Sequence, residues 1–476
     1  MTQPTPKRKT QYLAGICASL TFLFTGASSA WPSPALPKLK SETTLVDAQL
    51  SWIVSLTTIG GLPGCYIAQV LQERFGRKNT IFASAVPNII GTSIILLTTR
   101  AELLYLARFC TGLGMGMVAV VCMIYITEIA DKEVRGSLGM LIQVMMNLGL
   151  LTMYSIGPFV SYKTLNTLCV CLPVLYVVAT VWIPESPYYH LKDGRVAAAR
   201  KEFMVLKGVT DEKWVDEQLG IMRAHVRESM ENKTSMKELF TNLRYRRALY
   251  ITAGLKFLQY MTGSFAIQSY LELIFRQSSS VSGPLASIIY GLVQFTTGIA
   301  ATFLTRYFGR RVLMCTSSLG VGISLTVVGT FFYLQDCAKL SPESLASISL
   351  MPLIGILGFN ILYTVGIGNL PYVMQTELFP INVKTVASST ATMSACVFTF
   401  VVGKSYQFVK DSLGHYSVFW IFASVAYLGV FFVYFCVPET KGKTLEEIQD
   451  MLNVKHLEEA QALRSPVVTP VVEVDE

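Results

Sequence analysis

Several amide side chains lie inside long apolar blocks of this sequence, where they could bind a polar ligand. Gln143, Gln259 and Gln294 are all placed in this way. A side-chain amide both donates and accepts hydrogen bonds, so it suits an uncharged ligand that is rich in hydroxyl groups. An amide in apolar surroundings is costly unless it is paired or used. The alternative interpretation is that each glutamine bonds a neighbouring helix, which is common in membranes.

Charged motifs recur in the same order in the two halves of the chain. A basic loop motif at residues 74–78 has a counterpart at 308–311, and Pro-Glu-Ser at 184–186 has a counterpart in Pro-Glu-Thr at 438–440. Three such matches indicate a parallel duplication, which is typical of two-bundle transporters with a substrate site between the bundles. Carboxylate–guanidinium pairs at helix ends could bridge helices, although basic residues are also ordinary there. The third match is a glutamate seven residues before a cation: Glu128 with Arg135, and Glu377 with Lys384.

No group of residues in the sequence indicates an enzyme, a metal site or a nucleotide site. The four histidines are scattered, and the ten cysteines form no CxxC pair or His-Cys cluster, so we predict neither a zinc site nor a disulfide framework. No Walker motif is present, and the glycines at 112, 114 and 116 lie inside an apolar block with no strand before them. Small residues there, with Gly60 and Gly64, would let helices approach closely. We therefore expect no enzymatic activity, no cofactor and no ATP-driven step.

Composition and block length place the chain in a membrane. Only 15% of the residues are charged, whereas soluble domains average about 25%. Apolar blocks of about 20 residues span a bilayer as helices. The blocks predict an all-α membrane protein with twelve spans, at 11–31, 50–71, 80–98, 102–127, 137–160, 165–183, 247–275, 284–305, 312–334, 350–374, 386–408 and 416–437.

The basic residues predict the orientation of the chain and its division into parts. They gather before the first span and after spans two, four, six and eight, so the positive-inside rule places both termini in the cytoplasm. The polar stretch after span six has helical spacing of apolar residues, which predicts short cytoplasmic helices. The predicted parts are a six-helix bundle at 1–183, a helical linker at 184–246, a second six-helix bundle at 247–442 and a tail at 443–476 with one amphipathic segment, 445–463.

These motifs resemble those of the sugar-porter family of the major facilitator superfamily. The strings Pro-Glu-Ser-Pro at 184–187 and Pro-Glu-Thr-Lys-Gly at 438–442 are similar to the motifs that end the two halves in this family. The resemblance covers nearly the whole chain and implies the major facilitator fold, with twelve transmembrane helices in two six-helix bundles. The first span, with Gly26, Ala30 and Trp31, is most similar to insect facilitated trehalose transporters and facilitative glucose transporters. The family signature around the fourth span is similar to Arg108, Phe109, Gly112, Gly114, Gly116, Tyr125, Glu128, Arg135 and Gly136.

The resemblance implies a sugar-binding cavity between the bundles. Gln143 matches the family's sugar-binding glutamine, and Gln259 matches the first of its paired glutamines. Tyr372 stands where the family has a tryptophan beside the sugar. Tyr270 lies eleven residues after Gln259 and so on the same face of one helix. Several positions depart from the family and make the cavity more apolar: Tyr260 replaces the second glutamine, and Phe265 and Thr399 replace asparagines. Gln294 replaces another asparagine and keeps its amide.

Spans seven and ten contain residues that weaken a helix, and spans seven and eleven each contain a lysine. Residues 262–264 in span seven and Gly366, Gly368 and Pro371 in span ten are expected to permit bends. Lys256 in span seven and Lys404 in span eleven are expected to snorkel toward the membrane surface. If Lys256 instead faced the cavity, anionic solutes would become plausible. Arg108 is expected to pair or to bond backbone carbonyls.

The coupling mode follows from a missing carboxylate. Proton-coupled relatives carry an aspartate in span one, but residues 25–28 contain none, and an intramembrane carboxylate is the usual proton carrier. We therefore predict uniport of trehalose or a hexose across the plasma membrane by alternating access, with the sugar and the bilayer as partners and no nucleic acid. The alternatives are a carrier of a less polar or anionic organic solute, or a membrane sensor without turnover. The predicted cytoplasmic latch consists of Glu73, Arg77, Glu128, Arg135, Arg310, Arg311, Glu377 and Lys384.

Overall fold

The secondary structure of the chain is helical wherever the structure describes it. The computed structural model describes residues 8–209, 211–231, 240–241, 243–278, 281–379, 381–443, 447–448 and 451–452. Most of the predicted amphipathic segment at 445–463 lies outside these residues. The side chains of Arg135 and Lys384 also lie outside the described part, so their place in the latch stays a prediction.

Six long helices form the first half of the chain. A shorter helix follows the first of them directly. It begins with Pro32, and proline is favoured at the first position of a helix. The sixth predicted span follows a single 3-10 turn. In chain order the elements are α1 (Lys9–Ala30), α2 (Pro32–Glu42), α3 (Asp47–Arg74), α4 (Arg77–Leu97), α5 (Ala101–Ile129), α6 (Lys132–Ile156), η1 (Gly157–Phe159) and α7 (Tyr162–Val181).

Glycines set the spacing between α3 and α5. A Cβ at Gly60 would overlap the carbonyl of Phe109, and a Cβ at Gly112 would overlap the carbonyl of Thr57. Gly64 meets the backbone of Leu113 in the same way. Backbone-to-backbone approach of this kind strengthens dispersion contacts between helices that have no hydrophobic drive to associate within lipid. The glycines in these spans are therefore packing residues, as the sequence predicts.

The described part of the polar stretch between the two halves contains three helices, in agreement with the helical linker predicted from the sequence. Their bounds are α8 (Pro187–Lys192), α9 (Val196–Lys207) and α10 (Glu212–Glu231). They share a small core in which Phe203 packs beside Trp214, with Leu191, Val215 and Leu219 buried around them. The stretch is therefore a folded unit with its own apolar contacts.

The second half repeats the order of the first, with two of its spans divided. Gly263, at a φ of 84°, ends the helical run of span seven, and residues 366–369 interrupt span ten. Both breaks fall where the sequence predicts bends. The helices are α12 (Leu243–Met261), α13 (Ser264–Ser278), α14 (Gly283–Tyr307), α15 (Arg310–Asp336), α16 (Pro342–Ser347), α17 (Met351–Val365), α18 (Leu370–Leu378), α19 (Ile381–Leu413) and α20 (His415–Cys436).

Side chains satisfy the backbone at the break in span ten. The Asn369 amide Nδ2 donates to the carbonyl of Thr364 at 2.8 Å, and the Ile367 amide N–H donates to the Ser317 hydroxyl at 3.0 Å. A non-helical backbone inside a bilayer is tolerated only where such partners exist. The break is therefore built into the fold, with a hydroxyl from α15 supporting it.

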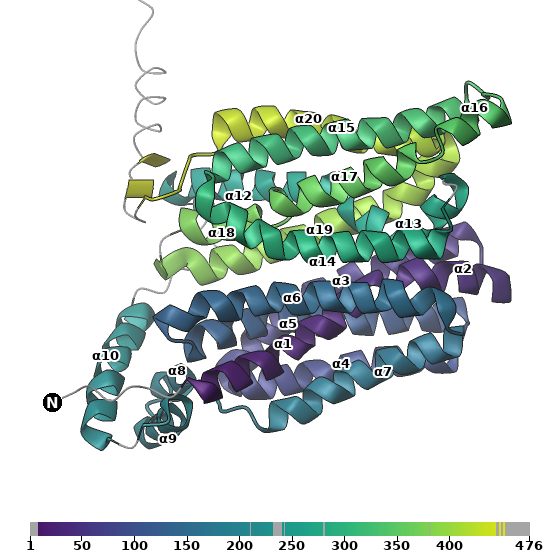
Figure 1. The fold of residues 1–476 in the computed structure, drawn as a ribbon. Helices are drawn as coiled ribbons and strands as arrows, with labels where there is room; N and C mark the ends of the chain where they lie inside the picture. The colour runs from purple at the N-terminus through teal and green to yellow at the C-terminus, as the bar shows by residue number, and fades with distance from the viewer. Residues whose placement is uncertain are drawn as a thin grey trace, which may run out of the picture.

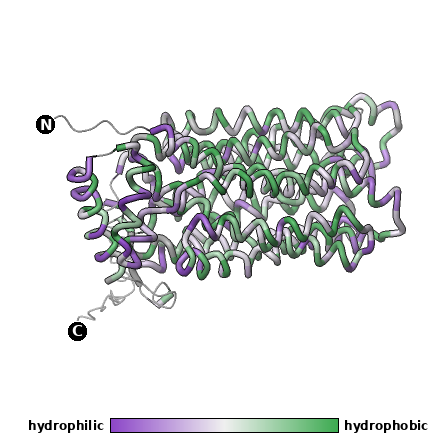
Figure 2. Tube along the Cα trace, turned by 90° about the horizontal axis from the view of Figure 1, so that it is seen from below, coloured by the Kyte–Doolittle hydropathy of each residue, from purple (hydrophilic) through white to green (hydrophobic). Residues whose placement is uncertain are grey.

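The helices form two bundles that lie side by side (Figure 1). We call the end that carries α8, α9 and α10 the linker side and the opposite end the distal side. Hydrophilic residues gather at these two ends, while the helices between them are mostly apolar (Figure 2). Within the described residues, 11 helices are long and apolar enough to cross a membrane. The predicted seventh span is absent from this set because α12 carries several cations and α13 has only 15 residues.

The two bundles contact each other on the distal side. The Tyr154 hydroxyl in α6 donates to the carbonyl of Gln268 in α13 at 3.2 Å. The backbone N–H of Glu272 donates to the Ser33 hydroxyl in α2, also at 3.2 Å. Along the rest of the interface α3 packs on α19 and α6 packs on α14. These bonds hold the distal ends of the bundles together.

Candidate functional site

A cluster of charged and hydroxyl groups joins three segments of the first half on the linker side. The guanidinium of Arg77, at the start of α4, donates to Glu128 Oε1 in α5 at 2.7 Å. The other carboxylate oxygen of Glu128 accepts from the Ser186 hydroxyl just before α8. Both members of the ion pair are mostly buried, with side chains 12% and 16% exposed. Low exposure makes such a pair worth more than one on the surface.

Glu185 caps the start of α4 in the same cluster. Its carboxylate accepts from the backbone N–H groups of Arg77 at 2.9 Å and of Lys78 at 3.1 Å. The first N–H groups of a helix have no partner within the helix, so a carboxylate there is favourable. Burial raises the pKa of the Glu185 carboxyl, and the bonds from these N–H groups, from Ser186 N–H and the nearby Arg77 charge oppose that shift. Gly76 leaves room for this carboxylate.

The second half builds the same cluster from its own residues. The Arg310 guanidinium donates to Glu377 Oε1 at 3.3 Å, and Thr440 donates to Glu377 Oε2 at 2.5 Å. Glu439 caps α15 by accepting from the backbone N–H groups of Arg310 at 2.9 Å and Arg311 at 3.1 Å. The repeated motifs therefore correspond to repeated contacts, and the contacts described for each cluster lie within its own half of the chain.

The remaining latch candidates occupy the edges of these clusters. Glu73 pairs with Lys192 of α8 at 3.4 Å and is half exposed. The Arg311 guanidinium donates to the carbonyl of Tyr434 and lies 4.9 Å above its ring. The latch predicted from the sequence lacks four residues of these clusters, Glu185, Ser186, Glu439 and Thr440. The signal that could have found them is the Pro-Glu-Ser/Thr string that ends each half.

Polar groups of α6 and α14 face each other across the bundle interface. The Gln143 amide donates to Asn147 Oδ1 at 3.2 Å. Asn147 is buried, and its amide lies against Gly298 of α14. Gln294, four residues earlier on α14, is 9% exposed, and its Oε1 atom has no hydrogen-bond partner among the described residues. Asn147 was missed from the sequence, although its position four residues after Gln143 puts it on the same helical face.

Gln259 ties α12 to the break in span ten. Its amide Nε2 donates to the carbonyl of Gly368 at 2.6 Å, and its Oε1 accepts from the Lys256 ammonium at 3.1 Å. The backbone carbonyl of Gln259 accepts from the Tyr363 hydroxyl at 3.0 Å. The side chain is 2% exposed. Gln259 therefore links the end of α12 to the chain between α17 and α18.

Aromatic side chains lie next to Gln259. The hydroxyls of Tyr260 and Tyr372 are 2.8 Å apart, and Tyr372 is 44% exposed. Phe265, just past the break in span seven, packs against Gly403 of α19. Thr399 donates to the carbonyl of Ala395, one turn earlier on its own helix, at 2.7 Å. Tyr260 and Tyr372 are thus the members of this group that the structure joins directly.

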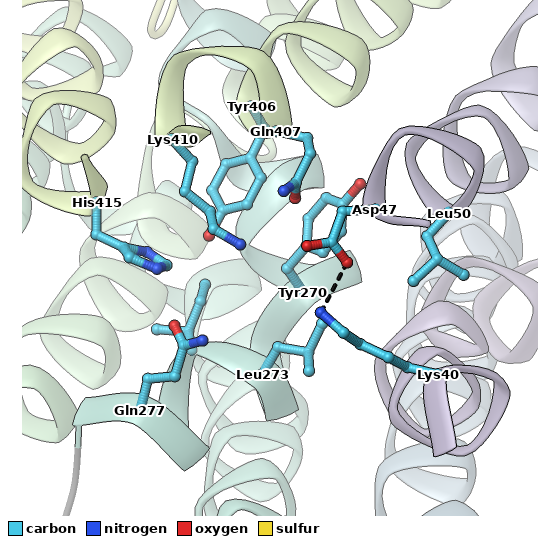
Figure 3. A pocket seen from close by; sticks show the side chains of 11 residues that line it. Lys40, Asp47, Leu50, Tyr270, Leu273, Gln277, Tyr406, Gln407, Lys410 and His415 are labelled. Atoms are coloured by element: carbon cyan, nitrogen blue, oxygen red, sulfur yellow. Dashed lines mark hydrogen bonds and ion pairs between the residues drawn. The ribbon is translucent and has the colours of Figure 1, made fainter. Parts of the chain in front are cut away.

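Tyr270 lies apart from these residues, on the distal side. Its ring stacks on Tyr406 with the centroids 4.6 Å apart. Both rings line a small pocket between the bundles, where Lys40 pairs with Asp47 at 2.8 Å (Figure 3). The prediction that Tyr270 shares a helical face with Gln259 is wrong, because Gly263 interrupts the helix between them.

Lys256 differs from its predicted position, whereas the snorkelling of Lys404, which is only partly buried, stays a prediction. Lys256 is 1% exposed and so does not snorkel; its Nζ lies 3.2 Å from the centroid of the Tyr372 ring. Lys404 donates to the Ser51 hydroxyl of α3 at 3.0 Å, which bridges the two bundles. The packing of α12 against α18 buries Lys256. Arg108 fits its prediction, since it donates to the carbonyl of Ile53 at 3.2 Å.

Comparisons with known proteins agree with this arrangement. The family model described as "Sugar (and other) transporter" matches residues 13–452. A protein of Apis mellifera ligustica named "Facilitated trehalose transporter Tret1" is 32% identical over 452 residues, which cover 93% of this chain and 88% of that protein. A relative of the same name from Drosophila yakuba is 34% identical over 450 residues, covering 92% of this chain and 51% of the relative. The chain thus spans about half the length of the fly relative.

Solved structures show the same fold. The inward open conformation of the xylose transporter XylE from E. coli matches with a TM-score of 0.75 at 20% identity, over 93% of this chain and 99% of that one. A structure of the proton:xylose symporter XylE bound to 6-bromo-6-deoxy-D-glucose matches with a TM-score of 0.74, also at 20% identity and over the same shares of the two chains. At this identity the likeness concerns the fold alone. It confirms the predicted all-α membrane fold of the major facilitator type.

Proposed function

Because this chain belongs to the family of sugar and other transporters, we propose that it is a facilitative uniporter that moves trehalose or a hexose across the plasma membrane by alternating access. In this proposal the linker side is cytoplasmic, since the basic residues gather there. The names of the insect relatives support trehalose as the first sugar to test.

The observation that carries the proposal is an unused amide at the interface of the two bundles. Gln294 is buried, and within the described part of the chain its Oε1 has no hydrogen-bond partner. An unsatisfied buried acceptor is costly, so a ligand hydroxyl that donates to it would be favoured. Gln143 from the other bundle offers an amide that is only partly buried. Together the two helices can bind an uncharged polyhydroxylated ligand from both sides.

The division of contacts supports alternating access. The distal ends of the bundles are held together by the bonds of Tyr154 and Ser33, whereas among the described residues the contacts of each linker-side cluster stay within one half of the chain. A bundle can therefore rock as a body without breaking its own cluster. The breaks at Gly263 and at residues 366–369 supply local bends in the second bundle.

The uniport part of the proposal rests on the middle of α1. Residues 25–28 contain no carboxylate, and their hydroxyls are already engaged. Thr25 donates to the carbonyl of Thr21 at 2.9 Å, and the Ser28 hydroxyl lies 3.4 Å from the Arg108 guanidinium. This site offers no group that would carry a proton at neutral pH.

Counterflow in proteoliposomes tests the proposal. Labelled trehalose and glucose are followed with and without a proton gradient, and we expect saturable exchange that ignores the gradient. Exchange that follows the gradient would overturn uniport. Sugar binding without any exchange would identify a sensor instead.

Substitutions at the amides locate the sugar. Gln143→Ala and Gln294→Ala should each weaken apparent sugar affinity about 10-fold, the loss expected for one hydrogen bond. Gln218→Ala in the linker helix α10 is the matched control and should leave affinity unchanged. Unchanged affinity in both cavity variants would remove this interface from the sugar site.

A further inference from the structure

Lys256 is a buried cation in the second bundle with no carboxylate beside it. It lies in α12, five residues before the last residue of that helix, Met261, and it is 1% exposed. The hydrogen-bond acceptor on its Nζ is Gln259 Oε1 at 3.1 Å. Among the residues that the structure describes, no carboxylate oxygen lies within 4.0 Å of this nitrogen. A charge buried without a counter-charge is strongly unfavourable, and ionisable residues within membrane spans usually mark ligand paths.

The ring of Tyr372 covers the ammonium. The Lys256 Nζ atom lies 3.2 Å from the centroid of that ring. The ring is itself 44% exposed and is held at its hydroxyl by Tyr260. The ammonium is thus separated from an accessible surface by the thickness of one aromatic side chain. A rotation of Tyr372 would expose it.

The other cations within the spans are better satisfied. Arg108 donates to the carbonyls of Ile53 and Ser28 and lies 5.0 Å from the Trp31 ring. Lys404 is only partly buried and donates to a hydroxyl. An ammonium has three N–H groups, and Lys256 directs one of them to an amide. Its remaining donors fit an oxyanion, which bonds an ammonium more strongly than a ring face does.

We propose that Lys256, Gln259, Tyr260 and Tyr372 form a subsite for the anionic group of a sugar that carries one carboxylate or phosphate. The inference rests on the proposed sugar transport and extends its substrate class to sugars that carry one negative group. The oxyanion takes the place of the Tyr372 ring against the Lys256 ammonium. The displaced ring then lies beside the sugar, where an aromatic face suits its C–H surface.

A pair of matched ligands tests the subsite in the unaltered protein. Glucuronate and its uncharged methyl ester are compared as inhibitors of labelled glucose counterflow in proteoliposomes. We expect glucuronate to inhibit at least about 10-fold more strongly than the ester, the ratio that one charge-assisted hydrogen bond provides. Glucose 6-phosphate in a parallel series tells whether phosphate or carboxylate is preferred. Equal inhibition by glucuronate and its ester, with no inhibition by the phosphate, would overturn the inference.

Variants assign the preference to the ammonium. Lys256→Met keeps the length of the side chain and should bring the ratio of the two inhibition constants close to one, whereas Lys256→Arg should keep the preference. Lys404→Met, the matched change at the other lysine within a span, should leave the ratio as it is. A preference that survives in Lys256→Met would refute the role of this residue.

The same experiments distinguish a failure of the proposed sugar transport from a failure of the anionic subsite. Glucose counterflow that no anion inhibits leaves the proposed sugar transport intact and removes the anionic subsite. If glucose is not exchanged, labelled glucuronate is used for counterflow instead. Saturable glucuronate exchange would then support the subsite and overturn uncharged sugars as the substrate. Exchange of neither compound would overturn both.

Discussion

The two halves of this transporter match at their linker-side ends and differ in their interiors. In the first half Arg77 pairs with Glu128, and in the second half Arg310 pairs with Glu377. Each of these glutamates also accepts a hydrogen bond from a hydroxyl group. In each half a second glutamate caps the helix that begins with the paired arginine, which is α4 in the first half and α15 in the second. The contacts that join helices at this end have therefore been kept in both copies of the repeat.

The interiors follow different packing rules. In the first half α3 and α5 are continuous and meet through glycines at backbone distance. In the second half spans seven and ten are broken, and side chains such as Asn369 and Gln259 satisfy the freed backbone groups. Close packing resists deformation, whereas a break can absorb a change of backbone angle. The comparison indicates a stiff first bundle and a second bundle with built-in bends.

The largest expected effect comes from disrupting the stiff interface. Gly112→Ala places a methyl group against the carbonyl of Thr57, so α3 and α5 must separate. Overpacking against backbone that cannot move aside should cost about 3 kcal/mol of unfolding free energy, measured by thermal unfolding of the purified protein in detergent. Gly139→Ala in α6 is the matched control, because nothing lies near its Cβ position. Similar melting of the two variants would contradict the packing comparison.

The glycines before the capped helices α4 and α15 differ in backbone conformation, and a pair of substitutions tests the effect of this difference on stability. A Cβ at Gly76 or at Gly309 would meet the capping glutamate in the same way. Gly76 has a φ of 92°, whereas Gly309 has a φ of −66° that any residue can adopt. Gly76→Ala should therefore be more destabilising than Gly309→Ala by about 1–3 kcal/mol, the cost of a strained backbone. The same unfolding measurement checks the difference, and equal losses would mean that the backbone relaxes.

The smallest expected difference is in the unfolding free energy that each of the two ion pairs contributes. The Arg77–Glu128 pair is 2.7 Å long and 12% and 16% exposed, whereas Arg310–Glu377 is 3.3 Å long and 20% and 25% exposed. Glu128→Gln should cost about 2 kcal/mol and Glu377→Gln about 1 kcal/mol, since bonds to charged groups weaken with distance and exposure. Asp47→Asn in the exposed pair with Lys40 is the reference and should change melting little. A larger loss at Glu377 than at Glu128 would reverse the ranking.

Features that depend on neighbouring residues in the chain could be predicted from the sequence. The apolar blocks predicted the helices, because block length and hydropathy are local properties. The recurring motifs predicted two similar halves with similar charged ends. Gly263 and the residues around Gly368 predicted the two breaks, since each lowers the stability of its own helix. The helical linker followed from the spacing of Phe203, Trp214 and Leu219 in the same way.

Which groups meet across helices was decided only by the tertiary structure. A helical repeat tells which residues share a face, but the surroundings of that face depend on the rotation and tilt of every neighbour. Lys256 was expected at the membrane surface, yet α18 covers it with Tyr372. Tyr270 was expected on the same helical face as Gln259, yet the break at Gly263 puts the two residues on different helices, and Tyr270 lines the distal pocket. The sequence alone thus determined the helices, the repeat and the family, whereas packing between helices determined the partners of each buried polar group.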